Sequence, residues 1–248
     1  MKNGLMKTRK LVLAMFLLMI SVVMTVQTSG HALSTWRAGK TVDRKVVESQ
    51  PLERWFTAQP IPDEVFARMK GRSFPADCTV PRSSLRYLRV LHVDAEGRVK
   101  MGEVVCNRLI ADDLIAIFRE LYRQRYALEC VRLIDDFDAE DERSMRANNT
   151  SSFCFRRVKG STRLSAHARG MAIDFNTLYN PYYKKRAHGT VVQPSNALRY
   201  CDRSANFPYK ITKGDLLYRL CVAHGFRWGG AWRTVKDWQH FEAASASF

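Results

Sequence analysis

Apolar residues that favour strands dominate two neighbouring stretches of the chain, residues 85–93 and 99–106. Runs of this kind predict two strands, and side chains of a strand point alternately to opposite faces. In the first stretch, one face carries Leu85, Tyr87, Leu91 and Val93. Residues 94–97, Asp-Ala-Glu-Gly, are typical of a turn. The pattern therefore predicts a β-hairpin over residues 85–106.

Helical spacing follows the hairpin. Between Asp112 and Arg123 the apolar residues recur every three or four positions, with Asp112 as a candidate cap. A second helix is predicted from a capping-box variant at Thr212–Asp215 to a stop at Gly225. Short strands are predicted at residues 130–134, 170–175 and 237–242. This order predicts an α+β fold, a small antiparallel sheet flanked by helices.

Three other regions lack a clear period. Residues 33–80 form a proline-rich stretch that we expect to be an N-terminal extension, followed by a main domain over residues 81–248. Residues 177–208 are polar and predict a long loop, which in a compact domain is functional or mobile. Residues 135–142 hold six acids in eight positions; a metal-binding loop is an alternative, but a solvated turn opening a helix is favoured.

The first 32 residues have the order of a secretory signal peptide. Four basic residues precede an apolar run of 16 residues, Leu11–Val26, and Gly30-His-Ala32 supplies small residues before a cleavage point. An uncleaved anchor is the alternative, but 16 residues fall short of the ~20 that span a bilayer. We therefore expect cleavage after Ala32, no membrane span in the mature chain, and a periplasmic or extracellular location.

The predicted export changes how the net charge and the cysteines are interpreted. Cleavage removes four basic and no acidic residues, which lowers the formal net charge from +16 to +12. Export argues against nucleic acid as a partner and leaves two alternatives, an anionic envelope polymer or a solvated basic surface. Six cysteines without a Cys-x-x-Cys pair predict disulfides in an oxidising compartment, with the connectivity left open.

Two histidines of the mature chain have sequence neighbours that are typical of a metal site. His167 is followed by Gly170, Ala172 and Asp174, and His240 lies three residues after Asp237. Two imidazoles and one carboxylate are enough for a catalytic zinc site with a position open for water. Spacing alone does not exclude the alternative that His167 and Asp174 lie in a loop and a strand without binding a metal. We do not expect the other three, His92, His188 and His224, to be metal ligands.

The two motifs together, Ser-x-His-x-x-Gly-x-Ala-x-Asp and Asp-x-x-His, resemble those of bacterial cell-wall zinc peptidases. That family includes D-alanyl-D-alanine carboxypeptidases and dipeptidases and L-alanyl-D-glutamate endopeptidases, and its fold is shared with the Hedgehog signalling domain. The resemblance covers roughly residues 130–242. It implies an enzyme that hydrolyses peptide bonds of peptidoglycan stem peptides with a zinc-activated water.

The resemblance also implies roles for individual residues. The zinc ligands would be His167, Asp174 and His240, and Asp237 would be the catalytic carboxylate. Ser165 would lie near the substrate, Arg143 would bind substrate or offset developing charge, and Asn148 or Asn149 would fill a nearby polar position. In one regular strand Asp237 and His240 would face opposite ways, so this assignment needs a bend. A non-catalytic cell-wall-binding module on the same fold is the alternative function.

Overall fold

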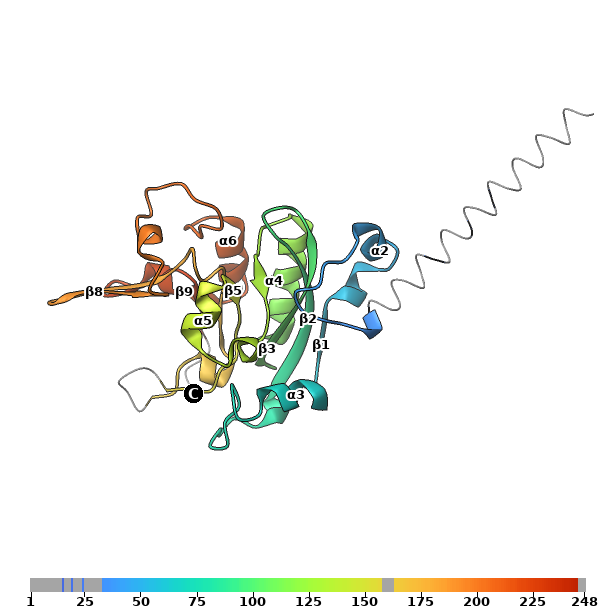
Figure 1. Ribbon diagram of the computed structural model, residues 1–248, viewed down its shortest axis with the longest axis horizontal. Helices are drawn as coiled ribbons and strands as arrows, with labels where there is room; N and C mark the ends of the chain where they lie inside the picture. Colours follow the sequence, from blue (N-terminus) through green and yellow to red (C-terminus); the bar gives the residue numbers. More distant parts are fainter. Residues whose placement is uncertain (1–14, 16–18, 20–23, 25–32, 158–162, 245–248) are drawn as a thin grey trace, which may run out of the picture.

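The computed structural model describes residues 33–157 and 163–244, together with the single positions 15, 19 and 24. The predicted signal peptide thus lies outside the described segments. No helix within them is both long and apolar enough to cross a membrane. The architecture is α+β, as predicted, with small antiparallel sheets and few helices (Figure 1).

The predicted hairpin forms the centre of the first sheet. Strand β2 (Leu85–Val93) pairs with β3 (Val99–Asn107) along its whole length, and β1 (Thr57–Gln59) pairs with the other edge of β2. Helix α4 (Ala111–Arg123) packs on this sheet through Leu114, Ile117, Phe118 and Leu121, which are all buried (Figure 1). The predicted cap was wrong: Ile110 precedes the helix, and Asp112 lies in its first turn, where a carboxylate favours the positive helix end.

Residues 33–80 are built into this sheet. They contain α2 (Arg44–Glu48), a 3₁₀ turn (Leu52–Trp55), β1 and α3 (Asp63–Met69). Trp55 and Phe56 are buried in the main core. The segment therefore completes the sheet and core on which the later elements rest.

The rest of the chain forms two further three-stranded sheets, ordered β6-β11-β9 and β10-β7-β8, and one parallel pair, β4-β5. The strands, in chain order, are β4 (Cys130–Val131), β5 (Asn149–Thr150), β6 (Ala172–Asp174), β7 (Tyr182–Arg186), β8 (Gly189–Gln193), β9 (Phe226–Trp228), β10 (Lys236–Asp237) and β11 (His240–Ala243). The helices and 3₁₀ turns are Ile134–Phe137, α5 (Asp141–Arg146), His167–Arg169, Leu198–Cys201, α6 (Leu216–Ala223) and Gly229–Ala231.

One helix boundary and one predicted loop differ from the sequence predictions. Helix α6 is capped by Asp215, whose side chain accepts from the Tyr218 amide at 2.8 Å, so it begins after the predicted capping box. Its predicted end is confirmed, since Gly225 takes a left-handed φ of 79°. The long loop predicted over residues 177–208 was wrong, because β7 and β8 form a hairpin there.

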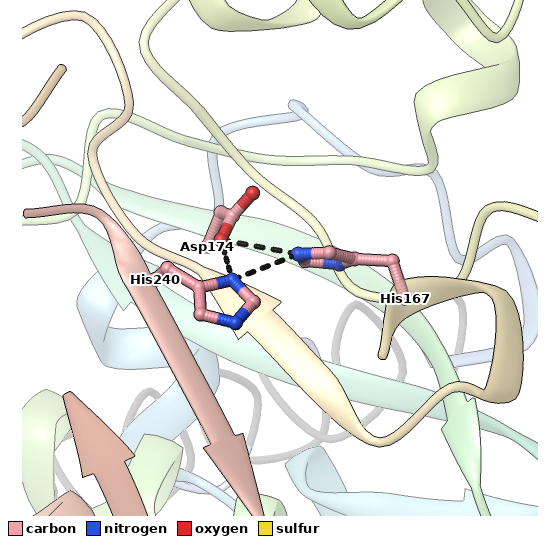
Figure 2. Close-up of side chains that lie close together, drawn as sticks. All are labelled: His167, Asp174 and His240. Carbon is pink, nitrogen blue, oxygen red and sulfur yellow. Dashed lines mark hydrogen bonds and ion pairs between the residues drawn. The ribbon is translucent and has the colours of Figure 1, made fainter. Parts of the chain in front are cut away.

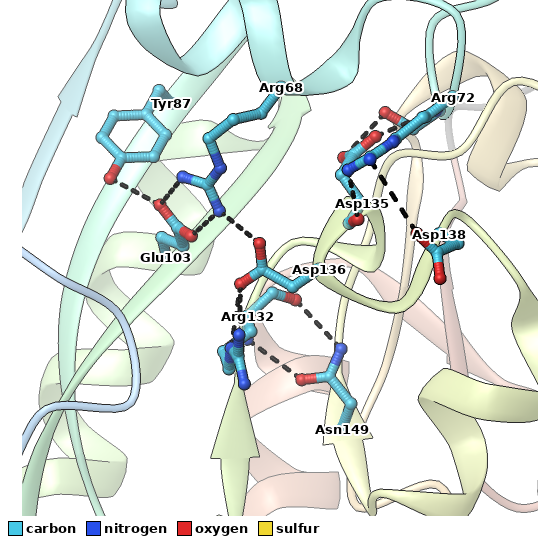
Figure 3. Close-up of polar contacts among 10 residues, drawn as sticks. Arg68, Arg72, Tyr87, Glu103, Arg132, Asp135, Asp136, Asp138 and Asn149 are labelled. Carbon is cyan, nitrogen blue, oxygen red and sulfur yellow. Dashed lines mark hydrogen bonds and ion pairs between the residues drawn. The ribbon is translucent and has the colours of Figure 1, made fainter.

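A polar network ties α3 to the sheet and to the acidic segment that follows β4 (Figure 3). Arg68 of α3 pairs with Glu103 at 2.5 Å and with Asp136 at 2.8 Å. The Tyr87 hydroxyl donates to the same Glu103 carboxylate at 2.8 Å. Asp135, the residue before Asp136, is buried, and its carboxylate accepts hydrogen bonds from Ser73. The acidic segment is thus only partly a solvated turn.

Arg68→Met should lower the free energy of unfolding by roughly 2–4 kcal/mol. Glu103 is only 3% exposed, so losing its guanidinium partner leaves a buried charge with one hydroxyl donor. The cost stays below that of a fully buried pair because the Arg68 side chain is 37% exposed. Urea unfolding measures the change. Arg44→Met, which breaks an exposed pair with Glu48, is the control and should cost less than about 0.5 kcal/mol.

The disulfide prediction is contradicted: all six cysteines are free thiols in this structure. Cys106 lies on β3 and Cys221 on α6, and both are buried among apolar side chains of the main core. Burial raises the pKa of both thiols, so they behave as small apolar residues and not as reactive thiolates. Cys78 packs instead against the second apolar cluster.

Candidate metal centre and active-site cleft

His167 is held by a single 3₁₀ turn whose sequence explains the first motif. The Ser165 hydroxyl accepts from the Ala168 amide at 3.0 Å and so caps the turn. Gly170 ends the turn with a left-handed φ of 66°. A Cβ on Gly170 would lie 2.7 Å from the Asn107 backbone nitrogen, so only glycine allows this close passage beside β3.

Asp174 and His240 are brought together by strand pairing. β6 and β11 are antiparallel, and Asp174 lies directly across from His240. Side chains of directly paired residues lie on the same face of a sheet. Strand register therefore places the second and third candidate ligands side by side.

Three side-chain atoms converge at this point (Figure 2). The Asp174 carboxylate oxygen lies 3.2 Å from His167 Nε2 and 3.0 Å from His240 Nδ1, and the two nitrogens are 3.1 Å apart. Within the described residues this is the one group of three or more histidine, cysteine or acidic side chains arranged to hold a metal ion. The structure thus joins three residues that lie far apart in the sequence.

The remaining imidazole nitrogens have partners that orient both rings. His167 Nδ1 is 2.7 Å from the Ser152 carbonyl oxygen and donates to it, which leaves the Nε2 lone pair facing the cluster. His240 Nε2 lies 3.5 Å from a Glu242 carboxylate oxygen. Carbonyl or carboxylate partners of this kind fix the rings of metal-binding histidines.

The donor set fits zinc. Neighbouring ligands of a tetrahedral zinc ion, each about 2.0–2.2 Å from it, lie roughly 3.3–3.5 Å apart, close to the separations found here. The cluster also favours positive charge. Although burial opposes it, Asp174 and Glu242 raise the pKa of His240 to about 10, while the two imidazoles hold the pKa of Asp174 well below its usual range.

Asp237 lies beside this cluster with an unused oxygen. Its Oδ1 is buried and has no hydrogen-bond partner. Burial raises the pKa of Asp237 to about 7, and the Asp174 charge adds to the effect while His240 opposes it. Gly229 lets this segment approach, since a Cβ there would lie 2.7 Å from the Asp237 carbonyl oxygen. A buried carboxylate with a pKa near neutral, in a cleft, is typical of a proton-transfer group.

The bend that the sequence assignment required is present. Asp237 ends β10 and His240 begins β11, and the two strands belong to different sheets. Trp238 and Gln239 connect them, so the alternation of a single strand does not apply. Asp237 and His240 both line one cleft of about 1260 Å³.

Comparison with known proteins gives a family match over part of the chain. Residues 159–243 match the family model described as D-alanyl-D-alanine carboxypeptidase. The match confirms the family resemblance inferred from the motifs. It contains all three candidate ligands and Asp237. No curated protein and no solved structure matches the chain.

Three residues that the resemblance placed near the substrate lie elsewhere. Arg143 is exposed on α5, where it pairs with Asp138, and it does not line the cleft. Asn149 is buried and bonds to the backbone of Arg132. Asn148 accepts from the Leu178 amide. Asn149 thus ties β5 to the residue after β4, and Asn148 contacts the segment that follows β6. Ser165 does line the cleft, although its hydroxyl caps the His167 turn.

Two residues at this site were missed in the sequence. Arg156 lines the cleft, which Arg143 does not, and it is held by Asp141 at 2.8 Å. Glu242 faces the second nitrogen of His240. A signal for Glu242 was present: residues two apart on a strand share a face.

Proposed function

We propose that the protein is an exported, zinc-dependent peptidase that hydrolyses peptide bonds of peptidoglycan stem peptides. The activity would be of the D-alanyl-D-alanine carboxypeptidase or the L-alanyl-D-glutamate endopeptidase type. One observation carries the proposal: His167, Asp174 and His240 converge in a cleft beside a buried carboxylate with an unused oxygen. The family match supports the peptidase class.

The chain supplies the parts of a hydrolytic site. Zinc held by His167, Asp174 and His240 would activate a water and polarise the scissile carbonyl. Asp237 takes the proton from the attacking water and returns it to the leaving amine. Arg156, fixed by Asp141, offsets negative charge that develops on the substrate.

Defined muropeptides incubated with zinc-loaded protein test the proposal. Mass spectrometry of the products identifies the bond that is cut. We expect one class of stem-peptide bond to be hydrolysed, and chelation of zinc to abolish the reaction. Intact muropeptides after incubation with fully zinc-loaded protein would contradict the peptidase proposal and favour a binding module.

Glu242→Gln should weaken zinc affinity by roughly 10–100-fold, the usual cost of losing a partner of a metal-binding histidine. The amide keeps the size of the side chain but loses the charge that faces His240 Nε2 at 3.5 Å. Zinc competition against a fluorescent chelator measures the affinity. Glu140→Gln, an acidic residue outside the cleft lining, is the matched control. Equal zinc affinity in wild type and Glu242→Gln would show that Glu242 does not support the ligand.

Export is the second part of the proposal. Its support is the order of basic, apolar and small residues over positions 1–32. We expect a mature N-terminus at Leu33. Intact-mass measurement of the secreted protein tests this, and a chain that retains its first 32 residues would contradict it.

A further inference from the structure

The β7–β8 hairpin forms one wall of the cleft, and it does so with one face only. The hairpin residues that line the cleft are Tyr182, Lys184, Arg186, Val191 and Gln193. Strand pairing sets Tyr182 across from Gln193 and Lys184 across from Val191, so these side chains share a face. In Figure 1 this hairpin projects at the end of the molecule opposite α2.

The other face of the hairpin is anchored. Tyr183 lies between Tyr182 and Lys184 in the sequence and points the opposite way. Its ring centroid is 6.0 Å from that of Trp238, and it packs against the main core. This anchor fixes which face of β7 is turned to the cleft.

Register also relates the wall to the proposed general base. β10 pairs with β7, and Asp237 lies directly across from Tyr182. Strands rise about 3.4 Å per residue, so Lys184 lies roughly 7 Å, and Arg186 roughly 14 Å, along β7 from that pair. An extended peptide has nearly the same rise. Lys184 and Arg186 are therefore spaced to meet groups about two and four residues from the cleaved bond.

The charge on this wall is uncompensated. Neither Lys184 nor Arg186 forms an ion pair with an acidic residue in the described part of the chain. The acidic residues that line the cleft already have partners or roles in the site. Asp141 pairs with Arg156, and the other three, Asp174, Asp237 and Glu242, lie in or beside the metal centre. The free charge that the cleft offers a substrate is positive.

From this geometry we infer that Lys184 and Arg186 form a subsite for carboxylates of an extended anionic peptide, several residues longer than a dipeptide. The inference rests on the proposed function and narrows its substrate to stem peptides whose acidic residues keep free carboxylates. Amidation of those carboxylates removes the charge that the subsite recognises. The subsite therefore acts on substrate choice and not on bond cleavage itself.

The test compares two stem peptides of identical sequence, one with free and one with amidated side carboxylates. We expect the zinc-loaded wild type to show a roughly tenfold higher kcat/KM on the free acid, an advantage that shrinks in ~0.5 M salt. In Lys184→Glu the advantage should be lost, and Lys184→Gln should give an intermediate ratio. Lys185→Glu is the matched control: it makes the same charge change on the next residue, which does not line the cleft, and should keep the wild-type ratio.

Binding measured without turnover separates this inference from the proposed function. Calorimetric titration of both peptides into Asp237→Asn, with and without Lys184→Glu, reports the carboxylate preference directly. A preference that Lys184→Glu leaves unchanged would overturn the subsite while the peptidase proposal stands. The opposite result is also possible: Lys184→Glu loses the carboxylate preference in binding, but the wild type cleaves neither peptide. That result would uphold the subsite and overturn the peptidase proposal.

Discussion

Asp237→Asn should lower kcat by roughly 10²–10⁴-fold, the usual worth of a positioned acid–base group. The amide is nearly isosteric with the carboxyl and fits the same half-buried place beside Gly229, so folding should be retained. It cannot take a proton from water at neutral pH. Steady-state kinetics on a cleaved muropeptide, with zinc content measured on the same sample, checks the result.

The alternative role for Asp237 is to orient His240. In that case zinc affinity, and not turnover, should suffer, by roughly 10–100-fold. The structure gives His240 other partners, Asp174 at Nδ1 and Glu242 at Nε2. Near-normal turnover at saturating zinc would eliminate Asp237 as the base.

His167→Ala should lose the metal and with it all activity. This change removes one of three ligands and leaves Asp174 and His240, which is too few for a stable zinc site. Elemental analysis should show about one zinc ion per chain in the wild type and almost none in the variant. Thermal unfolding with added zinc should show stabilisation of the wild type and none of the variant.

His188→Ala and His224→Ala are the controls for metal loss. His188 lies in the exposed turn of the β7–β8 hairpin, and His224 pairs with Asp113 at 2.8 Å, so neither contacts the cluster. Both variants should keep their zinc. Full zinc occupancy in His167→Ala would refute the ligand assignment.

The candidate ligands were found in the sequence because their geometry is mostly local. His167, Gly170 and Asp174 lie within one turn and the strand that follows it, and such short segments constrain residue types strongly. The pairing of His240 with Asp174 is long-range, and the linked motifs, not spacing, indicated it. The β2–β3 hairpin was predicted because both strands are rich in residues that favour strands and a turn sequence separates them.

Arg143 and the β7–β8 hairpin show where such reasoning fails. Arg143 has no motif that ties it to His167, and nothing in its surroundings distinguishes it from Arg156 before the chain folds. The hairpin faces a polar cleft with one side and anchors the other mainly through Tyr183. Its strands therefore lack the apolar alternation that marks a half-buried strand, and they resemble a loop.

The tight passage of Gly170 beside β3 sets a limit on how the segment that matches the family model can be separated from the rest of the chain. The Asn107 amide donates to the Gly170 carbonyl at 2.9 Å, and the Asn107 side chain donates to the Arg169 carbonyl at 3.0 Å. Ser152 and Cys154 hold His167 from outside the matched segment as well. The conformation of the segment that matches the family model thus depends on β3 and on residues 152–154, which lie outside that segment. A fragment cut to residues 159–243 would keep every chemical group of the centre and lose the scaffold that aims them.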